Sequence, residues 1–233
     1  MFGIAFRQAV ELLAAGAVDL WTIIITSLRV SATATLIGMV VGVPIGFLLG
    51  GTRFVGRRLL MVLTNTGMGL PPVVVGLFVL MMLSRSGPFG FLQMLYSQEA
   101  MVIAQVVIAT PLIVGVTAAA VAAVPRELRL QARSLGAGRV AEALLTIREA
   151  RLGVIAAIAA GFGGIISEVG AVQIVGGNIE GQTRVMTTAI VLEARRGNFG
   201  LALALGLMLI GLALLVNVVL TSYQHSHERY ERG

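Results

Sequence analysis

Side chains that could carry acid–base, nucleophilic or metal chemistry are few and widely spaced in this sequence. His225 and His227 stand as His-Ser-His in the C-terminal tail and could bind a metal ion, but a solvated tail explains this pair more simply. No Ser/His/Asp set and no pair of carboxylates falls within an apolar stretch, and lysine and cysteine are both absent. A Walker-type phosphate-binding motif requires a lysine. We therefore predict that the chain is not an enzyme and holds no nucleotide, metal or other cofactor.

Charge is concentrated in one interval, residues 125–151, which reads PRELRLQARSLGAGRVAEALLTIREAR. The interval lies between two apolar stretches and contains nine charged residues: Arg126, Glu127, Arg129, Arg133, Arg139, Glu142, Arg148, Glu149 and Arg151. Its composition favours helix, and the pattern predicts an amphipathic element in an internal loop that contacts a partner outside the lipid. The alternative is a helix that rests on anionic lipid, where arginine is also favoured.

The composition is that of a membrane protein. The chain has 233 residues, of which 57% are hydrophobic and 12% are charged, and its mean hydropathy is +0.94. A soluble domain carries about 25% charged residues. Five stretches exceed the roughly 18 apolar residues that a membrane-spanning helix needs, namely 21–51, 59–83, 100–124, 152–175 and 201–221. We find no internal repeat and no polar domain, so the sequence predicts one all-α integral membrane domain over residues 1–233, with a charged loop at 125–151.

The arginines predict the orientation of the chain, because cytoplasmic loops carry the excess of positive charge. Eleven arginines fall in three segments that five spans place on one side: the loop 52–58, the interval 125–151 and the C-terminal tail. We therefore expect a multi-pass protein with its N-terminus outside and its C-terminus in the cytoplasm. The net charge of +6 is then a topology signal, and no nucleic-acid partner is expected. Residues 1–21 are amphipathic without a clear cleavage site, which does not fit a removable signal peptide.

Two of the predicted spans contain residues that narrow or disturb a helix. In the first span glycine recurs every four residues, at Gly38, Gly42, Gly46 and Gly50. Such a face lets another helix approach closely, and Pro44 in the same span should kink it. Residues 67–76 in the second span read GMGLPPVVVG. Irregular backbone at membrane depth is tolerated where it is buried or lines a cavity, so both a broken helix beside a translocation path and a kink made for packing are open interpretations.

The charged interval resembles the cytoplasmic loop of the ABC importer permeases, which carries an EAA-and-glycine pattern. The matching residues are 130–137, LQARSLGA, in which Ala132 and Gly136 fit the pattern. Leu130 and Gln131 stand where the family usually has Glu and Ala, and the closing Leu-Pro is missing. The general pattern is therefore matched only in part, and a second block strengthens the resemblance.

This second block, residues 167–206, closely resembles the permeases that import molybdate and tungstate. In those proteins an E-x-G-A segment leads to a G-N-I-x-G-x-T-x segment on the external side. The corresponding residues here are Glu168, Gly170, Ala171, Gly177, Asn178, Ile179, Gly181 and Thr183. The form of the charged interval, followed by SEVGA, GGNI and TRVMTTAIVLE, looks most like the tungstate branch. The resemblance extends over the whole chain in length and layout and is strongest over 126–200.

The resemblance implies a type I ABC importer permease fold in the inner membrane of a bacterial or archaeal cell. It implies that two copies pair around the path, that separate ATPase subunits bind below them and use ATP and magnesium, and that an external oxyanion-binding protein delivers tungstate. Molybdate or another oxyanion remains an alternative. A stand-alone channel or secondary transporter is a further alternative, but such proteins often show internal repeats or several intramembrane ionisable groups. This chain shows only Arg29 and Glu168.

For the charged interval, the resemblance implies a coupling helix that fits a groove of the ATPase subunit. The residues assigned to this contact are Gln131, Ala132, Arg133, Ser134, Leu135, Gly136 and Ala137. A helix over 127–134 would dock by its arginines and by the side that carries Leu128 and Leu135. Residues 134–138 predict a turn, in which Gly136 permits backbone geometry and close approach that other residues resist.

Candidates for the path or its gate are polar groups that could guide a doubly charged oxyanion. They are Arg29, Ser31, Thr35, Asn65, Glu168, Gly177 and Asn178. Ser31 and Thr35 continue a helical face begun by Ser27, but such hydroxyls often bond back to their own helix. Arg29 could instead extend to the membrane interface. Asn65 precedes the irregular part of the second span and is expected to face inward.

Glu168 is a carboxylate within an apolar span and should be paired, protonated or in contact with water. Because its charge opposes that of an anionic substrate, we expect a structural or gating partner such as Arg184. Gly176, Gly177 and Asn178 form an outer turn. The N–H groups of this turn could lie at the mouth of the path, or the turn could simply let the chain reverse.

Overall fold

The computed structural model describes residues 2–15 and 18–231, apart from the side chains of residues 2, 5, 12–15, 18–19, 217, 219–221 and 223–231. The side chains of His225 and His227, which the sequence offers as a possible metal site, therefore lie outside the described part of the structure. The elements are, in order, α1 (Phe2–Ala15), α2 (Val18–Gly51), α3 (Arg57–Met68), α4 (Pro72–Leu83), the 3₁₀ turn η1 (Gly90–Leu92), α5 (Gln98–Ala122), α6 (Arg126–Ser134), α7 (Arg139–Ile166), α8 (Gly170–Gly176), α9 (Met186–Arg196) and α10 (Phe199–Glu231). The predicted all-α fold is confirmed.

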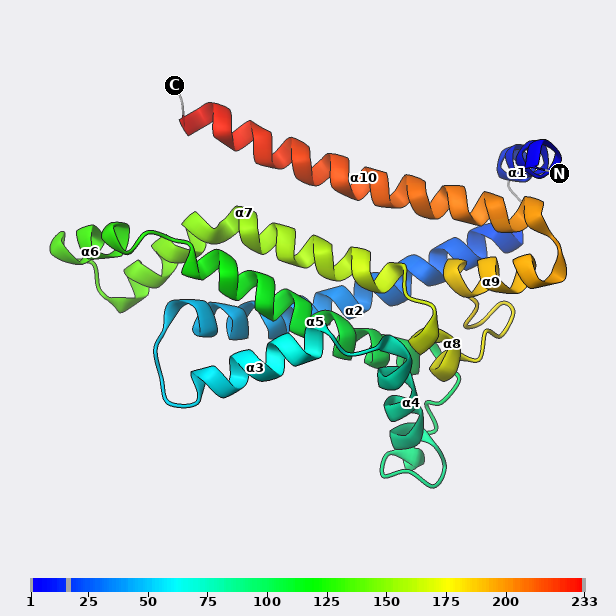
Figure 1. Ribbon diagram of the computed structural model, residues 1–233, viewed down its shortest axis with the longest axis horizontal. Coiled ribbons are helices and arrows are strands. Elements are labelled where there is room, and N and C mark those ends of the chain that lie inside the picture. The colour runs from blue at the N-terminus through cyan, green and yellow to red at the C-terminus, as the bar shows by residue number, and fades with distance from the viewer. Residues whose placement is uncertain (1, 16–17, 232–233) are drawn as a thin grey trace.

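The long helices α2, α5, α7 and α10 run along the long axis of the molecule (Figure 1). The short helix α6 lies at one end, here called the α6 end. The helices α1, α8 and α9 lie towards the other end, here called the α9 end. The loop that joins α2 to α3 lies on the same side as α6, which is the relative placement that the arginine pattern requires.

Among the described residues the structure contains four candidate spans, and the predicted number of five is reached only if one bent pair of helices counts as a span. Four helical stretches are long and apolar enough to cross a membrane: Leu20–Gly51, Gln98–Ala122, Arg139–Ile166 and Phe199–Val216. The pair α3 and α4 passes the same test together and makes a fifth span if the bent pair counts as one.

The second span is broken where the sequence predicts irregular backbone. Helices α3 and α4 are bent by 101° relative to each other, and the break falls within residues 67–76. Pro71 precedes α4 in an extended conformation, and Pro72 is the first residue of α4. A proline has no N–H to continue the helix before it, but its fixed φ suits the first turn of the helix after it. The local sequence therefore accounts for this break.

The fourth predicted span, 152–175, is also broken, which the sequence analysis did not anticipate. Helix α7 ends at Ile166, and α8 starts again at Gly170. The hydroxyl of Ser167 donates to the carbonyl oxygens of Gly163 and Gly164 at 2.9 and 3.1 Å, which satisfies two acceptors of the last turn of α7.

The predicted close approach of a helix to the glycine face of the first span is confirmed, and the helix concerned is α5. A Cβ atom built on Gly42 would lie 3.0 Å from Cγ2 of Ile113, and one built on Gly46 would lie 2.6 Å from Cβ of Thr117. Side chains on this face of α2 would therefore push the two helices apart. Helix α2 continues through Pro44 as one element and is not interrupted there.

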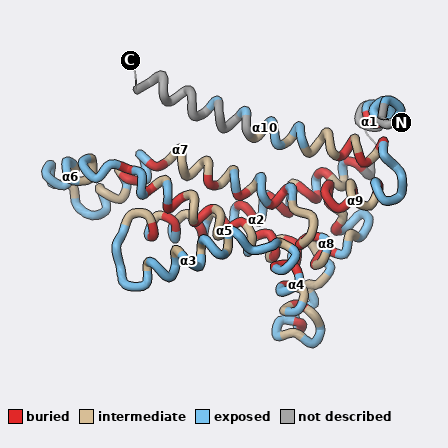
Figure 2. Tube along the Cα trace, viewed as in Figure 1, coloured by how far each residue is buried: buried red, intermediate tan, exposed pale blue. Residues whose placement is uncertain are grey.

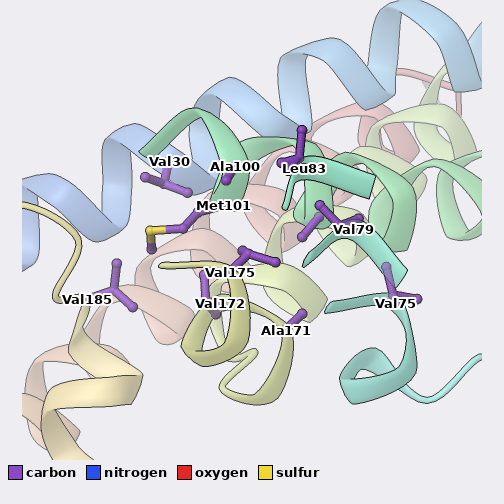
Figure 3. Packing of buried hydrophobic residues seen from close by; sticks show 11 residues of the cluster. Val30, Val75, Val79, Leu83, Ala100, Met101, Ala171, Val172, Val175 and Val185 are labelled. Atoms are coloured by element: carbon purple, nitrogen blue, oxygen red, sulfur yellow. The ribbon is translucent and has the colours of Figure 1, made fainter. Parts of the chain in front are cut away.

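The largest apolar cluster joins α2, α4, α5 and α8, and Figure 3 shows Val30, Val79, Met101, Val172 and Val175 meeting there. Helices α4 and α8, which follow the two breaks, pack closely against each other. In contrast, no residue of α3 is buried, and Figure 2 shows this helix as largely exposed. The two short helices after the breaks are thus part of the core, whereas α3 contacts α5 on one side and leaves most of its surface exposed within this chain.

Candidate functional site

Helix α6 projects at one end of the molecule and joins α5 to α7 (Figure 1). Its first turn carries Glu127 and its last turn carries Arg133, which matches the helix dipole. Nε and a terminal nitrogen of Arg133 donate to the two carboxylate oxygens of Glu142 on α7, at 2.7 and 3.0 Å. These hydrogen bonds, together with the negative charge of Glu142, raise the pKa of the Arg133 guanidinium. A bidentate ion pair thus ties α6 to the next helix.

The turn predicted at 134–138 is confirmed and closes α6. Gly136 has φ of +86°, a left-handed conformation that suits glycine. Its N–H donates to the carbonyl of Arg133 at 3.0 Å, and the N–H of Ala137 donates to the carbonyl of Ala132 at 2.9 Å. This is the Schellman pattern of a helix C-terminus. Apart from its two chain neighbours, no described residue has an atom within 4 Å of a Cβ built on Gly136, so this side of the turn is open.

Apolar side chains project from this charged end of the molecule. Leu135 is 89% exposed and Leu130 is 49% exposed. The prediction that Leu128 shares the docking side with Leu135 is wrong, because Leu128 packs inward against the cluster that contains Val121 and Ala150. Leu128 therefore holds α6 onto the bundle, and Leu130 and Leu135 form the free apolar surface.

A cavity of about 740 Å³ opens at the α9 end, where α2 meets the start of α5 and the loop before α9. Arg29 lines it and is exposed, and Glu99 lines it as well. The side chain of Gln98 donates to the carbonyl of Gln182 at 2.8 Å, which links the two segments across the cavity. Sequence reasoning missed both glutamines, because they are 84 positions apart and no local pattern marks them.

The hydroxyls predicted on the face of the first span are buried inside the chain. Ser27 donates to the carbonyl of Ile23, and Thr35 donates to the carbonyl of Ser31, both at 2.7 Å. Ser27 also accepts a hydrogen bond of 2.8 Å from the N–H of Met186, the first residue of α9. Bonding back to their own helix is therefore the correct interpretation for Ser27 and Thr35, and Ser31 is 2% exposed.

Asn65 lies on the exposed helix α3 and does not face the interior of its own chain. Within a single chain, the prediction that the Asn65 side chain faces inward is wrong. The reason is that α3 packs mainly against α5 and, to a small extent, α2, with none of its residues buried.

Glu168 has a structural partner, but that partner is not Arg184. Its Oε1 accepts hydrogen bonds from the N–H groups of Gly170 at 2.6 Å and Ala171 at 3.2 Å, at the start of α8. Arg184 forms its ion pair with Glu180, at 3.3 Å. The carboxylate thus compensates free N–H groups at the break between α7 and α8, where the helix N-terminus favours negative charge.

The outer turn after α8 is held by hydrogen bonds within the chain. The N–H of Gly177 donates to the carbonyl of Gln173 at 3.1 Å, and the side chain of Asn178 accepts from the hydroxyl of Thr188 at 2.9 Å. The hydroxyl of Thr183 donates to the carbonyl of Gly176 at 2.6 Å. The N–H of Ile179 donates to the hydroxyl of Thr183 at 2.9 Å. The N–H groups of Gly177 and Ile179 are therefore already used, which favours reversal of the chain over an open row of N–H donors.

Residues 42–229 match the family described as the binding-protein-dependent transport system inner membrane component. A probable anion ABC transporter permease of Haloferax volcanii is 45% identical over 198 residues, which are 83% of this chain and 85% of the relative. A tungstate uptake system permease of Peptoclostridium acidaminophilum is 41% identical over 219 residues, 94% of this chain and 96% of the relative. Both relatives are named as permease subunits, not as enzymes.

Solved structures of ABC importers share the fold. The permease chain of a bacterial alginate ABC transporter, solved in complex with an alginate pentasaccharide-bound periplasmic protein, superposes with a TM-score of 0.75 at 17% identity. This superposition covers 98% of this chain and 86% of that one. An inward-facing methionine ABC transporter gives a TM-score of 0.72 at 18% identity, over 86% of this chain and 92% of the other. With the helices and the family match, these likenesses place the chain in the family of binding-protein-dependent transport system inner membrane components, with the type I ABC importer permease fold.

Proposed function

We propose that this chain is the permease subunit of an ATP-driven importer that carries tungstate, delivered by an external binding protein. The observation that carries this proposal is the 41% identity with the tungstate uptake permease over 94% of the chain. The relative named as an anion permease supports the same class of substrate. Tungstate is a tetrahedral dianion, so the chain would need to attract it at one end and release it at the other.

The α6 end is proposed to receive movement from an ATPase subunit that binds ATP and magnesium, with no cofactor in this chain. The contact would comprise residues 131–137. Leu135 projects from the turn, and the ion pair between Arg133 and Glu142 joins this element to α7. Helix α7 packs in turn along α5 in the middle of the bundle. A displacement of α6 would therefore be transmitted into the helices that line the centre of the molecule.

A second copy of the chain is proposed to cover α3 and α4. Exposed apolar side chains on these helices include Leu59, Leu63 and Val74. Asn65 lies on α3, is equally exposed and would be unfavourable against lipid. If two copies pair around a hydrated path, Asn65 faces that path between the chains.

Arg29 is proposed to act at the outer mouth of the path. Its guanidinium lines the cavity at the α9 end and would attract a dianion, because charges interact more strongly at a protein surface than in bulk water. Glu99 in the same cavity would weaken the attraction, which suits a site that passes an anion on. This placement requires the α9 end outside and the α6 end in the cytoplasm, as the arginine distribution predicts.

The proposal is tested by reconstituting the chain in vesicles with and without an ABC ATPase subunit and a tungstate-binding protein from the same organism. Uptake of tungstate should require both partners and ATP, and the ATPase should co-purify with the chain. Molybdate offered in parallel separates the two oxyanions. Uptake by the chain alone would contradict the proposal and favour a channel.

A further inference from the structure

A second cavity, of about 670 Å³, lies at the α6 end between the C-terminal ends of α2 and α5 and the start of α6. Five arginines and one glutamate line it: Arg53, Arg57, Arg126, Arg129, Arg133 and Glu142. The arginines come from the loop after α2, the first residue of α3 and helix α6. A positive-inside topology requires arginines in these segments, but it does not require their convergence in one hollow. The convergence therefore needs a further explanation.

Two of these arginines donate hydrogen bonds to carbonyl groups at the C-terminal ends of helices. Nε of Arg57 donates to the carbonyl of Leu49 at 2.7 Å, near the end of α2. A terminal nitrogen of Arg129 donates to the carbonyl of Val124 at 3.2 Å, just after α5. Both contacts place a cation at the negative end of a helix dipole. Each uses only one of the five N–H donors of a guanidinium, so most donors remain for other acceptors.

The remaining donors outnumber the acceptors that the cavity supplies. Glu142 is the one carboxylate among the lining residues, and Arg133 engages both of its oxygens. Nε of Arg129 is buried and has no hydrogen-bond partner within the described residues. A buried cationic donor without an acceptor is unfavourable, and a bound anion would correct it.

The ends of two apolar helices at the cavity, and the exposed apolar residues that follow Arg53 in the chain, indicate that the cavity lies at the level of the membrane surface. Val55 is fully exposed and Phe54 is 44% exposed, directly after Arg53. Gly50, Gly51 and Ala122 mark the ends of two spans at its wall. Basic pockets between spanning helices are sites for phosphate groups of lipids.

We propose that this cavity binds a phosphate-class tetrahedral oxyanion group, held by the guanidinium groups of Arg53, Arg126 and Arg129. The group can belong to the headgroup of an anionic phospholipid or to a free anion. Guanidinium pairs with such oxygens through two parallel hydrogen bonds, which explains arginine at each position better than charge alone. The inference rests on the cavity and is independent of which substrate the protein carries.

The test measures the thermal unfolding midpoint of the full chain in a neutral detergent. One arm adds short-chain phosphatidylglycerol, a second adds inorganic phosphate, and short-chain phosphatidylcholine serves as the uncharged reference. At least one of the first two should raise the midpoint in a saturable manner, and the arm that responds identifies the source. The double variant Arg53→Gln with Arg126→Gln should bind about tenfold more weakly, as expected for the loss of charge-assisted hydrogen bonds.

The matched control is Arg58→Gln with Arg139→Gln, which removes two exposed arginines from the same end that do not line the cavity. Equal weakening in the control would mean diffuse surface charge and would overturn the proposal. Arg129→Lys, which keeps the charge but removes the buried Nε, should weaken binding without removing it. If neither probe binds and the double variant instead loses its ATPase partner, the cavity belongs to a protein interface and the proposal is wrong.

Discussion

Arg133 on α6 donates two hydrogen bonds, of 2.7 and 3.0 Å, to the carboxylate of Glu142 on α7, across the turn that contains Gly136. Apart from this ion pair, α6 is held to the bundle by Leu128 and by the hydrogen bond from Arg129 to the carbonyl of Val124. The pair is therefore well placed to decide whether α6 moves with α7 or independently of it.

Reversing one charge of this pair should uncouple transport from ATP hydrolysis. Arg133→Glu places two carboxylates face to face, so α6 should lose its fixed position while the spans stay folded. The measurement is the number of ATP molecules hydrolysed per oxyanion taken up. Adding Glu142→Arg to the first substitution restores opposite charges and should restore the ratio. Failure of this rescue would show that Arg133 acts through another contact.

Gly136→Val should damage coupling without unfolding the protein. The φ of +86° costs a β-branched residue about 1–2 kcal/mol or more, yet no atom of the described chain lies nearby to clash. The control is Gly138→Val, since Gly138 has φ of −73° and is equally unobstructed. Uptake and ATPase docking should fall for the first variant only. Equal uptake by the two variants would argue against the turn as a coupling element.

Glu168→Ala should destabilise the protein by about 1–2 kcal/mol, the usual cost of losing a helix N-terminal acceptor. The expected loss comes from the N–H groups of Gly170 and Ala171, which would lose the Glu168 carboxylate as their acceptor. Thermal unfolding in detergent measures it. Glu180→Ala is the control, because it removes the exposed partner of Arg184 and should change stability by about 0–1 kcal/mol. A larger effect at Glu180 would favour a role for the Arg184 ion pair.

Gly46→Ala should destabilise the packing of α2 on α5 by about 1–3 kcal/mol, as overpacking of a close contact does. The added methyl would lie 2.6 Å from Cβ of Thr117 and 2.7 Å from the carbonyl oxygen of Val114. Gly211→Ala on α10 is the comparison, because nothing lies within 4 Å of that position. Thermal unfolding should separate the two, and equal midpoints would mean that α2 and α5 are less closely packed than described.

Arg29→Gln should lower the rate of oxyanion uptake on the order of tenfold at low salt, with a smaller effect at high salt, because electrostatic attraction is screened. Arg29→Lys keeps the charge and should retain most of the rate. Arg85→Gln removes an exposed arginine that does not line the cavity and should have little effect. Transport kinetics at two ionic strengths provide the measurement. A salt-independent loss at Arg29 would indicate a structural role.

Features that depend on a few consecutive residues were predictable from the sequence. The apolar lengths indicate the spans, and the glycine and proline residues of 67–76 indicate the break between α3 and α4. The glycine at the end of α6 indicates its turn, because only a residue without Cβ adopts that geometry at little cost. The spacing of the glycines in α2 likewise predicts a helix at close distance, although not which helix.

Contacts between segments that are distant in the chain could not be predicted from the sequence. The break after Ile166 is stabilised by Ser167 at the end of α7, by the Glu168 carboxylate oxygen at the start of α8, and by the packing of α8 against α4. The hydroxyl residues Ser27, Ser31 and Thr35 would have the same spacing on a helix face that lines a path and on one that is buried. Their burial against other helices shows that they lie in the interior of the chain.

Hydropathy, turn residues and arginine placement act locally, so the amino-acid sequence was sufficient to indicate a membrane-spanning α-helical chain with one charged internal loop. Which polar groups form hydrogen bonds within the fold, and which remain available, depends on how the helices pack in three dimensions. Glu168 and Ser27 are used by neighbouring helix ends, whereas Arg29 and the arginines around Arg129 line open cavities. The physical reason is that a hydrogen-bonding group is satisfied by whatever lies within about 3 Å of it in space, and chain order does not specify those neighbours.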